Sequence, residues 1–170
     1  RSSDLGRTTG FVRALWKLDV TQRATANSQT LAPVEMQQIE SYRSKKIATH
    51  LIFNNGGVTR VRTEGEGEAT KKTTRDFTLP NLFDLYSAAL YLRSQPLKQG
   101  NVYRLAIYAT TNAYLATVTV TGREKISVHA GTYNAIKLEL GLNRIGKHLE
   151  LEPPRQFRRA TIWVSDDAER

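Results

Sequence analysis

Two adjacent carboxylates, Asp166 and Asp167, follow the apolar segment 160–164, with Ser165 between them and that segment. Paired carboxylates at the end of a strand are residue types that bind a hard cation or serve as general acid and base. Alternatively, Ser165, Asp166 and Asp167 form an Asx-type turn and satisfy their own backbone groups. We favour the turn, and we therefore predict no catalytic residue at this position.

Histidines and glutamates are the remaining side chains that could do acid–base or metal chemistry. The chain has three histidines, His50, His129 and His148. His50 alternates out of phase with the apolar residues of its predicted strand, His129 falls in a predicted turn, and His148 lies in a mixed-charge segment, so we predict no metal site. The glutamates at positions 64–68 alternate with glycine, which indicates a solvated loop rather than a pair of glycosidase carboxylates. The sequence also lacks a Gly-x-Ser-x-Gly nucleophile motif and a phosphate-binding loop. We therefore expect a protein that is not an enzyme, with no cofactor.

Aromatic side chains are the other candidates for contact with a ligand. Most of them fall on predicted strands, where core packing is the usual role of an aromatic residue. If several of them line a concave face instead, they are the best candidates for a binding surface. The candidate ligand-facing residues are Trp16, Tyr86, Tyr103, Tyr114 and Trp163.

The elements that must position these residues follow from the alternation of apolar and polar side chains. Between positions 113 and 122, Val118 and Val120 lie on one face of a predicted strand, and threonines at 117, 119 and 121 lie on the other. A turn at residues 129–132 leads into a second segment, where Ile136 and Leu138 recur with the same period. A period of two in segments rich in Val, Ile, Thr and Tyr is typical of half-buried antiparallel strands.

The same pattern predicts about eight strands and one helix. The tetrapeptide Asn54–Gly57 favours a tight hairpin, segment 22–38 is a polar connection into a second strand, and 65–74 is a solvated loop. We expect a short helix from the N-cap Asn81 to Leu92, with an apolar stripe formed by Leu82, Leu85, Ala89 and Leu92. The predicted strands are 11–21, 41–53, 58–64, 101–108, 113–122, 125–128, 133–142 and 158–165. The predicted fold is mainly β: an antiparallel half-barrel or barrel-like sheet with one short helix packed on or in it.

Composition places limits on the partners and on the size of the protein. A chain of 170 residues is long enough for one domain, and we predict a single β-rich domain over residues 6–170. Its net charge of +9 comes from 25 Lys and Arg spread along the chain. Many of these, such as Arg60 and Arg62, alternate with apolar residues, which we interpret as solvated outer faces of sheets. Nucleic acid is therefore not the partner we expect. No apolar run approaches the roughly 20 residues that a transmembrane helix needs.

Two further observations concern the cysteine content and the two ends of the chain. The chain has no cysteine, so thiolate chemistry and cysteine-based metal sites are excluded. The first five residues equal the translation of the end of a common sequencing adapter, so our hypothesis is that residues 1–5 are non-native sequence. We also expect the chain to be truncated at both ends.

Several motifs in a fixed order resemble a known family. They are Phe83–Arg93, Tyr103–Leu105, Val118–Glu124, Ala130–Leu138 and Ile162–Asp167. Together they resemble the DUF3108 family of exported bacterial proteins, whose function is unknown. The resemblance implies a β-rich, half-barrel or barrel-like fold, a periplasmic or exported location in the cell envelope, and no catalytic residues to transfer. The resemblance also implies a last strand after Asp167, which we expect to be missing because of the truncation.

Two hypotheses about function remain open. In the first, a curved antiparallel sheet of a non-enzymatic envelope protein binds an apolar or amphipathic ligand, or an envelope protein, because some strands are apolar or threonine-rich on both faces. In the second, a hydrolase acts on an anionic envelope polymer that the basic surface attracts. The hydrolase would require Asp166, Asp167 or a histidine to converge in one pocket.

Overall fold

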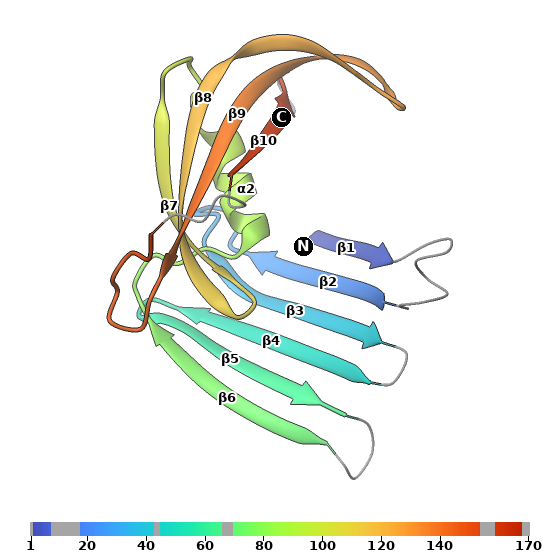
Figure 1. Ribbon diagram of the computed structural model, residues 1–170, viewed down its shortest axis with the longest axis vertical. Coiled ribbons are helices and arrows are strands. Elements are labelled where there is room, and N and C mark those ends of the chain that lie inside the picture. The colour runs from blue at the N-terminus through green and yellow to red at the C-terminus, as the bar shows by residue number, and fades with distance from the viewer. Residues whose placement is uncertain (1, 8–17, 43–44, 66–69, 154–158, 168–170) are drawn as a thin grey trace. The chain divides into compact units, whose positions relative to one another are not determined.

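The structure, a computed structural model, describes the chain in five segments (Figure 1). These are residues 2–7, 18–42, 45–65, 70–153 and 159–167. The described residues form two antiparallel sheets and one helix, which confirms the fold class predicted from the sequence. Both sheets are open along the described strands and are not closed into a barrel. The chain divides into two compact units, Arg1–Ser87 and Ala88–Arg170.

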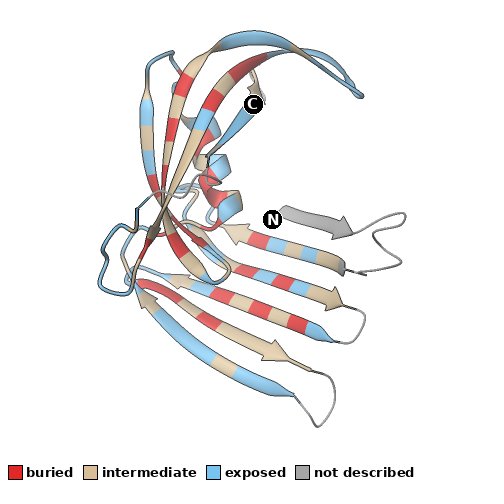
Figure 2. Ribbon diagram, viewed as in Figure 1, coloured by how far each residue is buried: buried red, intermediate tan, exposed pale blue. Residues whose placement is uncertain are grey.

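The first unit contains a six-stranded meander in which each strand pairs with the next one along the chain. Its strands are β1 (Ser2–Arg7), β2 (Leu18–Ala26), β3 (Pro33–Tyr42), β4 (Lys46–Asn54), β5 (Gly57–Glu64) and β6 (Lys71–Thr78). Side chains on β4 alternate between the two faces of the sheet: Ile47, Thr49 and Leu51 are buried, while Ile52 is exposed (Figure 2). One face of this sheet therefore carries the buried side chains.

A tight turn joins β4 to β5, as the Asn-Asn-Gly-Gly sequence predicts. Asn54 pairs with Gly57 across the turn, and the side-chain oxygen of Asn54 accepts a hydrogen bond from the Gly56 N–H at 2.8 Å. Gly57 has a φ of 149°, in a region that side chains disfavour. The turn fixes the register of the hairpin, so that Leu51 lies opposite Arg60.

The second unit contains a four-stranded sheet in the order β10-β9-β8-β7. Its strands are β7 (Val102–Ala109), β8 (Asn112–Val128), β9 (Gly131–Ile145) and β10 (Arg159–Ser165). Strands β8 and β9 form a long curved hairpin (Figure 1). The sequence predicts two strands, 113–122 and 125–128, where the structure has β8 alone. A register shift between Val120 and Gly122 lets β8 continue through this position.

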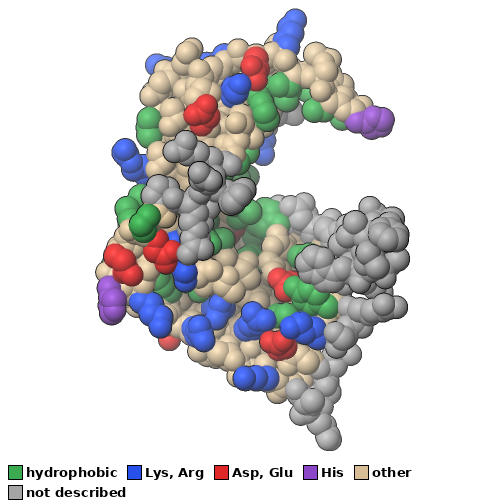
Figure 3. Space-filling view, in the orientation of Figure 1, with side chains coloured by type: hydrophobic (Ala, Val, Ile, Leu, Met, Phe, Trp, Pro, Cys, Tyr) green, Lys and Arg blue, Asp and Glu red, His purple; other side chains and the backbone are tan. Residues whose placement is uncertain are grey.

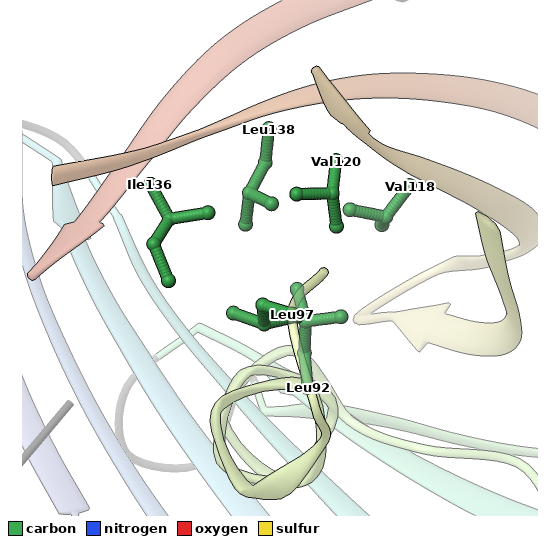
Figure 4. Packing of buried hydrophobic residues seen from close by; sticks show 6 residues of the cluster. All are labelled: Leu92, Leu97, Val118, Val120, Ile136 and Leu138. Carbon is green, nitrogen blue, oxygen red and sulfur yellow. The ribbon is translucent and has the colours of Figure 1, made fainter. Parts of the chain in front are cut away.

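A cluster of apolar side chains forms the core of the second unit (Figure 4). Val118 and Val120 of β8 and Ile136 and Leu138 of β9 point toward two leucines that follow one another closely in the chain. These leucines are Leu92 and Leu97. Ile136 and Leu138 have no exposed surface. The alternation that predicts these strands also correctly selects their buried face.

The helix, α2 (Leu85–Ser94), begins later than the sequence predicts. Asn81 is not the N-cap: it lies in a turn with a φ of 57°. Asp84 caps the helix instead, because its carboxylate accepts hydrogen bonds from the backbone N–H groups of Tyr86 at 2.7 Å and Ser87 at 3.1 Å. The Ser87 hydroxyl oxygen accepts the Asp84 N–H in return, at 3.1 Å. Such a reciprocal arrangement is a capping box.

The predicted apolar stripe of this helix is wrong at two of its four positions. Leu85 is 58% exposed, and Ala89 is exposed as well. Ala88, which the predicted stripe omits, is buried one turn before Leu92, which is buried as predicted. The shift follows from the later start of the helix, because Leu82 precedes it and contributes a buried side chain outside any helical period.

Two segments predicted as connections contain strands. Segment 22–38 includes most of β2 and β3, and the predicted loop at 65–74 includes the start of β6 at Lys71. Strand β6 carries mostly Lys, Arg, Thr and Asp side chains and lies at the edge of its sheet, where charged side chains discourage further strand pairing. Within the described segments, no helix has the length and apolar character required to span a membrane.

Candidate functional site

A row of polar side chains crosses one face of the first sheet, on the side that also carries its buried residues. The register places these side chains directly opposite one another on five successive strands. From β2 to β6 the row consists of Gln22, Gln38, Thr49, Arg62 and Thr73. Gln38 and Thr49 are buried. Residues directly opposite each other in an antiparallel pair project to the same face, so these five side chains form one line on that face. We call this line the polar row.

Apolar side chains flank the polar row on the same face. In the next row, Ala24, Met36 and Leu51 lie side by side on β2, β3 and β4, and all three are buried. Beyond them, Val58 on β5 is buried opposite Phe77 on β6. The face therefore combines a stripe of hydrogen-bonding groups with apolar surface, which is the composition of sites for small amphipathic molecules.

Hydrogen bonds link one end of the polar row into a network of five side chains. The Tyr86 hydroxyl donates to the Gln22 side-chain oxygen at 2.7 Å. The Gln22 amide donates to Gln38, and the Gln38 amide donates to the Glu40 carboxylate. The Tyr42 hydroxyl donates to the other oxygen of that carboxylate at 3.0 Å. Burial raises the pKa of the Tyr42 hydroxyl, and the adjacent Glu40 carboxylate raises it further. The hydroxyl therefore stays protonated and acts as a donor.

On β5, next to Arg62 of the polar row on the same face, two cations contact the carboxylate of Glu64. It accepts a hydrogen bond from Lys45 at 2.9 Å and lies 3.3 Å from the Arg62 guanidinium. The hydrogen bond and the charge of Lys45 lower the pKa of Glu64. Glu64 is therefore already engaged by Lys45 and Arg62.

We expect the substitution Lys45→Ala to raise the pKa of Glu64 toward that of a free glutamate. The folded-state pKa is depressed, so the pairing stabilises the fold at pH above the unfolded pKa, and this contribution disappears as the pH falls through the folded pKa. An NMR titration of the Glu64 carboxyl carbon measures the shift. An unchanged midpoint in the variant would show that Lys45 does not hold the carboxylate.

Arg60 breaks the apolar row of this face, and its burial contradicts the sequence interpretation. We interpreted Arg60 as a solvated side chain on an outer face, but it is 7% exposed. It lies opposite the fully buried Leu51 on one side and opposite Arg75 on the other. Its Nε atom is buried without a hydrogen-bond partner. The tight β4–β5 turn could have revealed this from the sequence, because it sets Arg60 against the buried face of β4.

Charged side chains elsewhere on the first sheet are intermixed. Figure 3 shows Lys and Arg side chains interspersed with Asp and Glu over the surface formed by β3–β6. On the face opposite the polar row, His50 lies 2.9 Å from the Glu35 carboxylate, and the Thr59 hydroxyl donates to Asp76 at 2.7 Å. Each of these acidic groups thus has a partner on its own face, remote from the arginines at 60 and 75.

The predicted ligand-facing aromatics of the second unit do not all share one face of its sheet. Trp16 lies outside the described residues. Tyr86 belongs to the hydrogen-bond network of the first unit. In the second unit, Tyr103 and Tyr114 share the face that carries the core cluster, since Tyr103 pairs with Val118. The Tyr103 hydroxyl donates to the Pro96 carbonyl at 2.6 Å, and its ring packs against the core cluster.

Trp163 lies on the other face of the second sheet and is 43% exposed. Its indole N–H donates to the Glu124 carboxylate at 2.7 Å. Lys137, its cross-strand partner, lies 3.6 Å from the same carboxylate and 5.9 Å from the centre of the indole ring. A hydrogen bond to Glu124 and a cation–π contact with Lys137 therefore fix Trp163 on the surface of β10.

The acidic pair at the end of β10 has local partners. Asp166 forms an ion pair with Arg123 at 2.8 Å, and Arg123 also donates to the Leu97 carbonyl at 3.0 Å. Asp167 accepts a hydrogen bond from the Ser165 hydroxyl at 3.3 Å. His129 and His148 are exposed in separate turns. Among the residues whose positions the structure gives, no three His, Asp or Glu side chains gather as metal ligands.

These features define a mainly β protein whose first sheet presents a face of mixed polarity, with a buried arginine among apolar side chains. Comparison with protein families shows that the chain belongs to the family described as "Protein of unknown function (DUF3108)", which it matches over residues 1–170. The resemblance of its motifs to that family is thus confirmed. Comparisons with curated proteins and with solved structures found no match.

Proposed function

We propose that this chain is a non-enzymatic binding protein of the bacterial cell envelope, periplasmic or exported, which takes up an amphipathic ligand on the polar-row face of its first sheet. The observation that carries the proposal is the polar row itself. Five hydrogen-bonding side chains stand in one line across β2–β6, and apolar side chains that include Met36, Leu51 and Val58 lie beside them.

Buried polar side chains such as Gln38 and Thr49 are costly in a sheet that serves only to enclose a core. Burying a polar group without a partner costs on the order of 1–3 kcal/mol in proteins. Gln22 and Gln38 meet this cost through their mutual hydrogen bond and those to Tyr86 and Glu40. A ligand whose polar atoms hydrogen-bond to the polar row, and whose apolar atoms pack against the flanking side chains, would contact both parts of the face.

The location in the envelope is supported by the family, since the motifs of this chain resemble those of exported bacterial proteins. The proposal that the protein is not an enzyme is supported by the partners of its acidic groups: Asp166 is paired with Arg123 and Glu64 with Lys45. A carboxylate held by a cation is a poor general base near neutral pH, because the pairing stabilises its ionised form.

Titration of the delipidated protein with a neutral, environment-sensitive apolar dye tests the proposal. We expect saturable binding with one main site. The substitution Thr73→Trp introduces a bulky ring on the polar-row face of β6 and should weaken binding by about tenfold or more. Thr74→Trp is the matched control, because Thr74 lies next to it on the opposite face, opposite Val61. Absence of saturable binding, or equal loss in both variants, would refute this site.

A further inference from the structure

We propose that Arg60 and Arg75 form a binding site for an oxyanion, a carboxylate or phosphate group carried by the ligand. We call these two residues the arginine pair. They lie directly opposite each other on β5 and β6, so both side chains project to the polar-row face. The inference rests on the proposed function for the apolar part of the ligand, but the anion site itself stands on separate observations.

Like charges placed directly opposite each other in a sheet are destabilising. Arg75 is exposed, but Arg60 is more than nine-tenths buried. A buried cation without a counter-charge is among the costliest features in a protein interior. The position therefore calls for an anion that neutralises both guanidinium groups.

No acidic side chain of this face fills that role. The register gives the neighbours of Arg60 on the same face of the sheet. On its own strand they are Val58 and Arg62, and on β4 and β6 they are the residues paired with Val58, Arg60 and Arg62. Those cross-strand neighbours are Thr49, Leu51, Phe53, Thr73, Arg75 and Phe77. Asp76 projects to the opposite face, and Glu64 is held by Lys45 and Arg62. No ion pair or hydrogen bond reaches the Arg60 guanidinium from the part of the chain that the structure describes.

The surroundings of the arginine pair indicate the chemistry of the ligand. Guanidinium groups present N–H donors in a planar fork that matches the geometry of carboxylate and phosphate oxygens. Hydroxyl groups of Thr49 and Thr73 lie one row away on one side, whereas Val58 and Phe77 lie one row away on the other. An anionic head group at the arginines would thus have polar neighbours toward the polar row and apolar neighbours for an attached chain. Since β6 is an edge strand and Arg75 is exposed, the site is reachable from solvent at this edge.

Calorimetric titration of the delipidated protein with decanoate, decanol and inorganic phosphate tests the site. The first two probes share an apolar chain and differ in their head group. We expect decanoate to bind about tenfold or more tightly than decanol, since hydrogen bonds to charged groups are the strong ones. Arg60→Met and Arg75→Met should each remove that preference. Arg60→Met replaces a buried charge by an apolar side chain of similar length, a change that is often neutral or stabilising for folding.

Lys72→Met is the matched control, because it removes the same charge from the same edge strand but on the opposite face. It should leave the preference for decanoate unchanged. Equal affinity for decanoate and decanol would overturn the anion site and leave the proposed function standing. Arginine-dependent binding of phosphate as tight as that of decanoate would support the anion site but identify a free oxyanion as its source. Binding of the dye and decanol with no effect of either arginine variant on decanoate would refute the role of the arginine pair.

Discussion

The substitution Gly57→Ala is expected to lower the free energy of unfolding of the first unit by about 3 kcal/mol. A Cβ atom at this position would lie 2.1 Å from the backbone carbonyl oxygen of Phe77. That oxygen belongs to the neighbouring strand β6, which cannot move away without breaking its pairing with β5. The backbone of Gly57 also has a φ of 149°, which L-residues rarely adopt.

Gly56→Ala is the matched control for this substitution. It places a methyl group in the same turn, where the nearest atom is the side-chain oxygen of Asn54 at 3.4 Å. We expect this variant to unfold within about 1 kcal/mol of the parent protein, as most exposed substitutions do. Urea titrations followed by circular dichroism compare the two variants. Similar losses in both would show that the turn as a whole, rather than the close approach to Phe77, makes glycine necessary.

Alternation was sufficient to predict the strands that have one apolar face. Buried residues recur at 116, 118 and 120 in β8 and at 136 and 138 in β9, so a period of two identified both the strands and the face on which Val118 and Leu138 lie. The Asn-Asn-Gly-Gly turn was equally informative, since its residues suit only a tight hairpin. In these parts of the chain, local sequence and tertiary packing favour the same structure.

The strands that the sequence missed are those whose side chains face solvent or hydrogen-bond to one another. Strand β6 has few apolar residues. It is an edge strand, and its backbone pairs with a neighbouring strand on one side only. Strand β3 contains the consecutive glutamines Gln37 and Gln38, whose cross-strand partners on β2 are distant in the sequence. Hydropathy alone does not record such partners.

Apart from Tyr86, the residues of the candidate site escaped prediction for the same reason. Arg60 alternates with apolar residues in the sequence, which suggested a solvated position, but its face is determined by pairing with β4. Gln22, a partner of Gln38, lies on another strand, and Lys45, a partner of Glu64, lies in a neighbouring connection, so no local motif indicates either contact. Aromatic content pointed instead to residues such as Tyr103 and Trp163, which have structural contacts of their own.

Leu138→Ala is expected to destabilise the second unit by about 3–4 kcal/mol. Leu138 has no exposed surface, and its side chain packs in the core cluster with Val120 and Ile136. Truncation of a fully buried leucine costs roughly 2–5 kcal/mol, because it loses both transfer free energy and packing around the cavity. Leu151→Ala is the control, since Leu151 is 54% exposed. Equal midpoints for the two variants in urea would contradict the packing of this core.

The pair of substitutions Gly57→Ala and Leu138→Ala also tests whether the chain is one domain. The two residues belong to the units Arg1–Ser87 and Ala88–Arg170, each with its own sheet. Because each sheet buries its own apolar face, we expect two unfolding transitions, with each substitution lowering only the transition of its own unit. The indole of Trp163, fixed on β10 by Glu124, reports on the second sheet by fluorescence. A single transition that both substitutions lower by additive amounts would support the single β-rich domain predicted from the sequence, since cooperative unfolding couples every buried contact to one equilibrium.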